Sequence, residues 1–212
     1  MTSRRHVPYA LLAAALLLPA APATAVGLTV PVQCEVGSET VLAWDDVAYD
    51  LRGTCGVVRV TADAASVTMP AATRLVVEGS GNTITAKSVY DVLVTGTSNA
   101  VTTPSITTLA VTGAGSDVAV AGLVEHAELT STGSSLTADT VNVLRLRGAD
   151  TVTARKAYRT RITGSDNVVR LRRGDRLVLT GDRNGVTVER GRTSVRDRGD
   201  DNVLDLRRRT RR

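Results

Sequence analysis

Residues 75–84 read LVVEGSGNTI, a segment whose pattern of apolar and turn-forming residues indicates how the chain folds. Leu75 and Val77 are apolar and lie two positions apart. Gly79, small polar residues and Asn82 follow them. Because alternate residues of a strand point to opposite faces, this order predicts a strand, a tight turn and a second strand.

The same order recurs along the chain, about every 17 residues from Gly79 onward. The glycines that mark the copies are Gly53, Gly79, Gly96, Gly113, Gly133, Gly148, Gly164, Gly181 and Gly199. Positions four and two before the last eight of these glycines hold 13 apolar residues among 16, whereas positions three and one before them hold only four. Such alternation indicates strands with one buried face.

The length of the repeat sets the architecture. A period of about 17 residues leaves no room for a helix between the strands. Short strands at this period predict stacked coils, each about 4.8 Å from the last. We therefore expect an all-β, single-domain parallel β-solenoid of eight or nine short coils with an N-terminal cap, and the crossover rule favours right-handed winding.

The turn residues need no ligand to explain them. Glycine takes a positive φ without steric cost and asparagine tolerates it, so stacked corners select both. Stacked asparagine amides can also hydrogen-bond each other along the axis. Calcium binding is the alternative, but glycine-aspartate repeats bind calcium in nine-residue rolls, and the period here is longer. We expect no metal site and no cofactor.

The chain divides into four expected segments. They are a signal peptide at 1–25, an N-terminal cap at 26–48, solenoid repeats at 49–206 and a basic flexible tail at 207–212. The signal peptide is indicated by two early arginines, an apolar stretch and a small-x-small cleavage site ending at Ala25. The 26-residue step from Gly53 to Gly79 predicts a loop of about nine extra residues near 61–73. No later stretch is apolar for long enough to predict a membrane span.

The chain has two cysteines, Cys34 and Cys55. In an exported protein they are expected to form one disulfide, which would fasten the cap to the first corner. Two free thiols are the alternative. A redox role is not expected, because redox-active cysteine pairs typically have a C-x-x-C spacing, which is absent here. In the chain-entropy model the closed loop contributes about 3 kcal/mol.

The pattern Val-x-Gly-Ser-x-Asn-x-Val recurs behind the signal peptide, for example at 75–84 and 161–169. It resembles a family of exported bacterial proteins of unknown function that is common in high-GC actinobacteria. The resemblance covers residues 53–206 and implies export and a solenoid, but no activity. The copies at Gly133 and Gly148 depart from the pattern because they lack the asparagine.

Charge is divided along the chain. Residues 26–144 carry four basic groups and 12 carboxylates, a net charge of −8, whereas residues 145–212 carry 20 basic groups and nine carboxylates, a net charge of +11. Arginines of the basic part fall at outward offsets, and the candidate anion-binding residues are Arg145, Arg147, Arg161, Arg196 and Arg198. Arg159, Arg170 and Arg172 fall at outward offsets too. Stacked guanidinium groups suit phosphate or carboxylate polymers, and a merely solvated face is the alternative.

These features favour an exported, non-catalytic scaffold or adhesion module of the cell envelope. Its expected partners are an anionic cell-wall polymer or an acidic protein surface, and the charge division predicts head-to-tail self-association. Nucleic acid is not expected, because the aromatic residues that stack on bases are almost absent.

Two other functions stay open. A polysaccharide lyase or hydrolase would need converging carboxylates, and the clustered candidates are the corner residues Asp166, Asp182, Asp200 and Asp201. We expect these to be polar corner residues and His126 to be a structural histidine near an inward column. An ice-binding solenoid would display ranks of threonine, here Thr95, Thr112, Thr132, Thr163 and Thr180.

Overall fold

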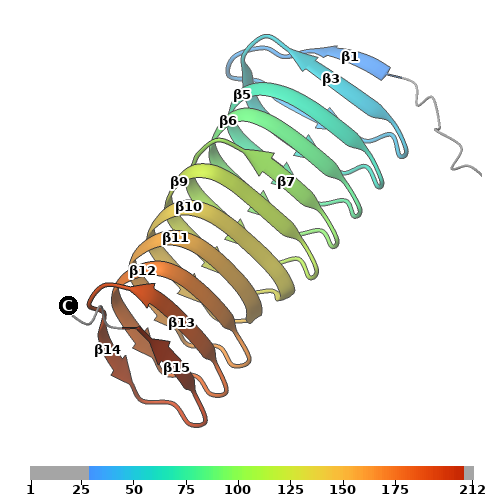
Figure 1. Cartoon of the computed structure of the whole chain (residues 1–212). Helices are drawn as coiled ribbons and strands as arrows, with labels where there is room; N and C mark the ends of the chain where they lie inside the picture. Colours follow the sequence, from blue (N-terminus) through green and yellow to red (C-terminus); the bar gives the residue numbers. More distant parts are fainter. Residues whose placement is uncertain (1–28, 208–212) are drawn as a thin grey trace, which may run out of the picture.

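A computed structural model describes residues 29–207, so the expected signal peptide and all but Arg207 of the basic tail lie outside the described residues. The described chain has no helix and is a parallel β-solenoid of about ten coils. Figure 1 shows flattened coils stacked along one axis, with the first strands at one end of the stack and the last at the other. The all-β solenoid prediction is therefore confirmed.

Fifteen strands build the coils, and every pair is parallel. They are β1 (Thr29–Gln33), β2 (Glu39–Leu42), β3 (Ala48–Arg52), β4 (Cys55–Val60), β5 (Ser66–Val77), β6 (Thr83–Val94), β7 (Ala100–Thr103), β8 (Ile106–Val111), β9 (Asp117–Leu129), β10 (Thr132–Leu146), β11 (Ala149–Ile162), β12 (Val168–Leu179), β13 (Gly185–Arg190), β14 (Ser194–Asp197) and β15 (Val203–Leu206).

The coils have two flat sides joined by a bend. The first side follows the order β1-β3-β5-β6-β7-β9-β10-β11-β12-β13-β15. The second side contains β2, β4, β8 and β14 together with the later halves of the long strands β5, β6, β9, β10, β11 and β12, which continue around the bend. We call the solvent-facing surfaces of these sides the first face and the second face.

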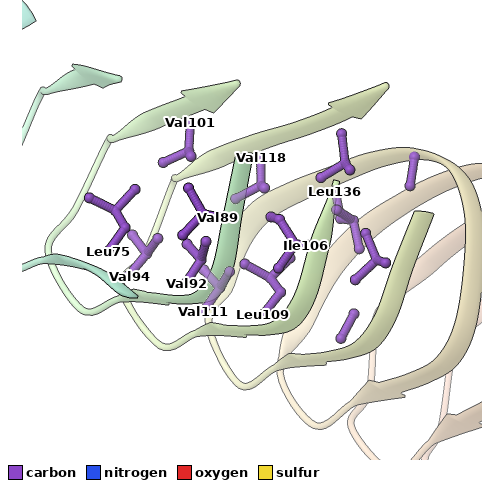
Figure 2. Close-up of a cluster of buried hydrophobic side chains, with 14 of the residues drawn as sticks. Leu75, Val89, Val92, Val94, Val101, Ile106, Leu109, Val111, Val118 and Leu136 are labelled. Carbon is purple, nitrogen blue, oxygen red and sulfur yellow. The ribbon is translucent and has the colours of Figure 1, made fainter. Parts of the chain in front are cut away.

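The core is a set of aliphatic columns between the two sides. Leu75, Val92 and Leu109 are paired in register on successive coils, and so are Val77, Val94 and Val111. All of them are fully buried. Figure 2 shows Leu75, Val92 and Leu109 beside Val94 and Val111 in this core. The predicted alternation is thus confirmed. One break in the column is Thr160, which stands between Leu144 and Leu177 and whose hydroxyl has no hydrogen-bond partner.

We call the turn from the second side of one coil to the first side of the next the corner. The glycines at the corners are required for a reason other than the one predicted. A Cβ added at Gly79, Gly96 or Gly113 would lie 1.8 or 1.9 Å from the carbonyl oxygen of the matching corner residue one coil earlier. Positive φ angles occur two positions later, at Asp46, Ala64, Gly81, Ser98, Gly115, Gly133, Asp166, Arg183 and Asp201. Most of these residues are not glycine. The corner glycine therefore serves the close approach of stacked backbones, and its assignment to positive φ was wrong.

The stacking of the corner residues also corrects which residues mark the start of each repeat. Ala62 and Ser131 occupy the corner positions, because their carbonyl oxygens face the glycine one coil later. Gly53 instead lies between β3 and β4, and Gly133 has the positive φ. The extra loop expected near 61–73 is absent, since most of that segment belongs to β5.

The segment expected as a cap is itself coiled. β1 pairs with β3 and β2 pairs with β4, in the same parallel arrangement as the rest of the stack. The first coil, which contains β1 and β2, and the coil that begins after the corner at Ala62 were not counted in the prediction. The stack therefore has about ten coils, compared with the eight or nine predicted.

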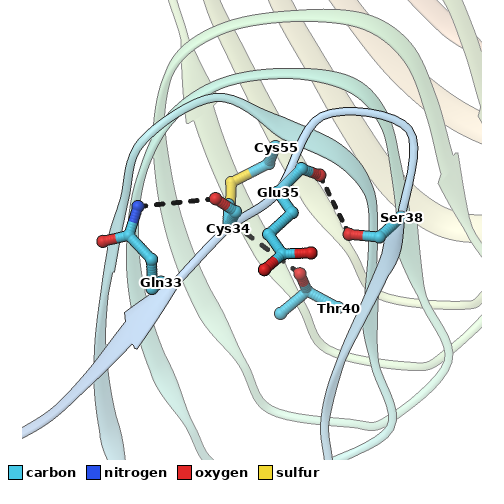
Figure 3. The surroundings of a disulfide bond; sticks show 6 residues. All are labelled: Gln33, Cys34, Glu35, Ser38, Thr40 and Cys55. Atoms are coloured by element: carbon cyan, nitrogen blue, oxygen red, sulfur yellow. Dashed lines mark hydrogen bonds between the residues drawn. A yellow bond between two sulfur atoms is a disulfide. The ribbon is translucent and has the colours of Figure 1, made fainter.

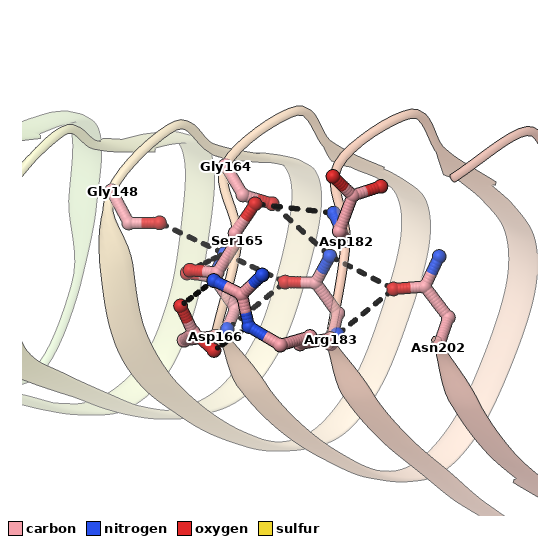
Figure 4. A network of polar contacts seen from close by, with 9 residues as sticks. Gly148, Gly164, Ser165, Asp166, Asp182, Arg183 and Asn202 are labelled. Carbon is pink, nitrogen blue, oxygen red and sulfur yellow. Dashed lines mark hydrogen bonds and ion pairs between the residues drawn. The ribbon is translucent and has the colours of Figure 1, made fainter. Parts of the chain in front are cut away.

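The predicted bonds between asparagine side chains are present. Nδ2 of Asn82 donates to Oδ1 of Asn99 at 3.1 Å, and Asn167 donates in the same way to Asn184 at 2.9 Å. Each Nδ2 also donates to a corner carbonyl of the preceding coil, as Asn202 does to Gly181; Figure 4 shows this stack near the C-terminal end. Ser116, Ser134 and Asp150 occupy the same column where asparagine is missing.

Asp150 is the one carboxylate in this column. It is 2% exposed; its Oδ1 accepts hydrogen bonds from the Ser131 hydroxyl and the Ser134 N–H, while Oδ2 has no partner. Oδ2 and the Ser131 carbonyl oxygen both lie beside Gly148, where an asparagine would place its donating amide. Burial raises the pKa of the Asp150 carboxyl, against the lowering effect of its two hydrogen bonds.

We expect Asp150→Asn to stabilise the protein at neutral pH by about 1–2 kcal/mol, because an amide can donate where a buried carboxylate cannot. A raised pKa in the folded state favours folding below the unfolded pKa, and this contribution is lost as the pH rises through the folded pKa. The advantage of the variant should therefore shrink at acid pH. Melting temperatures of both proteins at pH 7 and pH 4 test this, and a constant difference would contradict a raised pKa of the Asp150 carboxyl.

The disulfide is present as predicted. Cys34 and Cys55 are bonded, both are buried, and they connect the end of β1 to the start of β4 (Figure 3). The Thr40 hydroxyl lies 3.9 Å from the Cys34 sulfur. The bond therefore links the first coil covalently to the next.

Candidate anion-binding face

The predicted arginines gather on the second face over the last coils. Arg145 of β10 pairs in register with Arg161 of β11, and Arg196 of β14 follows one coil beyond Val178. The residues on either side of Arg145 and Arg161 are buried, so strand alternation turns these two side chains to solvent. Arg196 is exposed at the equivalent position of the last coil, where Val195 is only partly buried and Asp197 is exposed. Arg147 and Arg198 occupy the next outward column, at the end of the same strands. All five candidates are thus on one face.

Two further arginines join them. Arg159 of β11 and Arg176 of β12 are paired in register and form a third column at the edge of the bend. We call these seven the arginine face: Arg145, Arg147, Arg159, Arg161, Arg176, Arg196 and Arg198. Arg170 and Arg172 are exposed as predicted, but Arg170 lies on the first face and Arg172 lies near the bend.

Most of these guanidinium groups lack a carboxylate partner. Arg147 pairs with Glu128 at 3.2 Å, but the other six make no ion pair with any residue in 29–207. Several arginines elsewhere are neutralised, as Arg59 is by Glu39 and Glu78, which raise its pKa. Unpaired like charges on neighbouring strands repel one another, so an anion that bridges them is favoured.

The arginine face is hollowed. A depression of about 510 Å³ is lined by His126, Val178 and six of the arginines, Arg147 being the exception. Arginine forks around a shallow depression can each hold a carboxylate or phosphate by two parallel hydrogen bonds. His126 was expected near an inward column, but it lies one position away from the buried residue Ala127 and is exposed on this face.

A second depression adjoins the first at the bend. It has a volume of about 630 Å³ and is lined by Glu125, His126, Asn142, Val143, Tyr158, Arg159 and Asp175. Arg159 and His126 line both depressions. Sequence reasoning missed this site, because at the bend two successive residues such as Glu125 and His126 both face outward and interrupt the alternation.

The corner aspartates do not converge on a cleft. Asp166 binds Arg183 of the next coil at 2.8 Å, which holds the pKa of the Asp166 carboxyl below its ordinary value (Figure 4). Asp182 accepts a hydrogen bond from the Asp200 backbone N–H. They act as polar corner residues. Within residues 29–207 no group of three histidine, cysteine or acidic side chains is arranged to hold a metal, and the described chain has no helix that could span a membrane.

The threonine rank differs from the prediction at one position. Thr130, not Thr132, shares a column with Thr112 on the second face, because Ser131 is the corner residue. A second rank lies on the first face and contains Thr68, Thr85, Thr102, Thr137, Thr153 and Thr187. Ala119 and Arg170 interrupt it. Its β-branched side chains suit the solvent side of a sheet.

Comparison with protein-family models, with curated proteins and with solved structures finds no match for this chain. The fold alone assigns it to the β-solenoids. Fold does not determine function, so the arginine face and the depression beside it are the features that bear on function.

Proposed function

We propose that this chain is an exported, non-catalytic β-solenoid that serves as a scaffold or adhesion module of the cell envelope and holds an anionic polymer on its arginine face. The observation that carries the proposal is the set of six outward arginines without a carboxylate partner among residues 29–207, all lining one depression. The Cys34–Cys55 disulfide, the basic and apolar N-terminus and the resemblance to exported solenoid proteins support the location.

A polymer fits this surface better than a small anion does. The arginine columns repeat with the coils, about every 4.8 Å along the axis. A chain of anionic groups that runs along the axis can contact several of them at once, and each further contact is then intramolecular. Weak exposed pairs of about 0.5–1 kcal/mol each therefore add up to useful affinity.

The other end of the stack is acidic, and it supports the proposed self-association. Residues 26–144 carry a net charge of −8 against +11 for residues 145–212. In a solenoid the sequence position is also the axial position, so opposite ends of two molecules attract. An acidic protein surface, a second copy included, would compete with the polymer for the arginine face.

The triple variant Arg145→Glu, Arg161→Glu, Arg196→Glu should bind an anionic cell-wall polymer about 10- to 100-fold more weakly than the wild type, since three attractions become repulsions. The matched control reverses Arg170, Arg172 and Arg190, the last residue of β13, none of which lines the depression. It changes the net charge equally and should bind nearly as the wild type does. Binding to immobilised polymer at low and physiological salt is the measurement. Wild-type affinity should fall steeply with salt.

The same assay separates the alternatives. If both triple variants lose the same amount of affinity for the polymer, only the net charge of the protein matters. If removing residues 207–212 alone abolishes binding, the tail holds the polymer and the arginine face does not. Release of soluble fragments or new chain ends from the polymer would show a lyase or hydrolase and contradict the non-catalytic proposal.

A further inference from the structure

The depression at the bend has a composition unlike that of the arginine face. Glu125, Asn142, Tyr158 and Asp175 come from four successive coils, because the residues flanking them are paired in register from β9 to β12. One residue of each coil is therefore presented side by side along the axis. This column combines two carboxylates, an amide and an aromatic ring.

Tyr158 is the apolar surface of the depression. Its side chain is partly exposed, at 39% for the residue, and Lys156 Nζ lies 3.8 Å from the ring centroid. The ammonium covers one face of the ring and fixes its orientation. The uncovered part of the ring is left for a ligand in the depression, and sugar rings present apolar C–H faces that pack on such surfaces.

The polar groups beside the ring are mainly acceptors. Asn142 Nδ2 donates to Glu125 Oε2, which leaves the Asn142 carbonyl oxygen and Glu125 Oε1 without a hydrogen bond in the described structure. Asp175 makes no ion pair within residues 29–207 and lines the same depression. Carboxylates accept hydrogen bonds from hydroxyl groups. They repel a chain of phosphates, which carries charge but no donors.

We infer that the two depressions form one groove for an acidic polysaccharide, in which Tyr158 packs on a sugar ring, Glu125 and Asp175 accept from its hydroxyls, and Arg159 leads into the arginine face that holds the acidic groups. This inference rests on the proposed function and names its ligand class. Arg159 and His126 line both depressions, so they are continuous at this point. Polyphosphate would use the arginine face only.

The test compares two probes, polygalacturonate and inorganic polyphosphate, on the mature protein and on Tyr158→Ala. The variant should bind polygalacturonate about tenfold more weakly and polyphosphate unchanged, because only the sugar contacts the ring. Tyr90→Ala is the matched control. Tyr90 occupies the same bend column four coils earlier and is 61% exposed, but it does not line the depression. It should leave both affinities unchanged.

A second variant, Asp175→Asn, gives an independent readout. It should strengthen polyphosphate binding by removing a nearby negative charge, while it does not strengthen polygalacturonate binding, which loses a strong acceptor. If Tyr158→Ala and Tyr90→Ala bind polygalacturonate alike, the sugar subsite is refuted while the arginine face stands. If neither probe binds the wild type, the proposed function itself fails.

Discussion

Gly96→Ala is expected to destabilise the protein by about 3 kcal/mol or more, the upper range for inserting a group into a packed interior. A Cβ at Gly96 would lie 1.9 Å from the Gly79 carbonyl oxygen and 2.5 Å from that of Glu78. These atoms are backbone, so they can move only if the coils separate. The same carbonyl of Gly79 accepts from Asn99 Nδ2 at 2.8 Å, and separation would break this bond as well.

Thermal unfolding followed by circular dichroism measures the effect, and Gly185→Ala is the matched control. No atom lies within 4 Å of a Cβ added at Gly185, and its φ is not positive. The control should melt within a few degrees of the wild type, because open-space substitutions change stability by about 0.5 kcal/mol at most. Similar melting temperatures for the two variants would contradict the close stacking of the corners.

Leu144→Asp is expected to prevent cooperative folding of the coils around it. Leu144 is 0% exposed and stands in register between Ala127 and Thr160, so an aspartate there would be a lone charge in an aliphatic core. A penalty above about 4 kcal/mol is expected, which is a large part of the stability of a single domain.

Arg145→Asp is the control for that substitution, because the same side chain is introduced one position later on the exposed face. It should change stability by about 0.5 kcal/mol or less. The measurements are the yield of folded protein and the melting temperature of each variant, compared with the wild type. An unchanged melting temperature in Leu144→Asp would show that the assignment of inward and outward positions is wrong.

The strand pattern could be predicted because it depends on local alternation. Leu75 and Val77 and their equivalents are buried in the coils before the last, where Asp197 is exposed, and this requires only the two-residue period of a strand. The predicted corner positions were wrong where Gly53 and Gly133 were taken as the corner residues. Ala62 and Ser131 occupy the corner equally well, because the tight contact is made by the glycine one coil later.

The candidate site was predicted in part for the same reason. Arg145, Arg161 and Arg196 follow the alternation and were placed on the face they occupy. The depression at the bend depends on Glu125 and His126 both facing outward, and a period of two cannot predict this. Its residues come together only through the stacking of successive coils, which no local pattern contains.

The central claim is that the arginine face, and no other arginines, holds the anionic polymer. Labelling the wild type with an arginine-selective reagent, with and without bound polymer, and locating the labels by mass spectrometry tests it most directly. We expect protection at the six arginines that line the depression, Arg145, Arg159, Arg161, Arg176, Arg196 and Arg198, with Arg170 and Arg172 labelled as in the free protein. Equal protection of Arg170 and Arg172, or protection confined to residues 207–212, would contradict it.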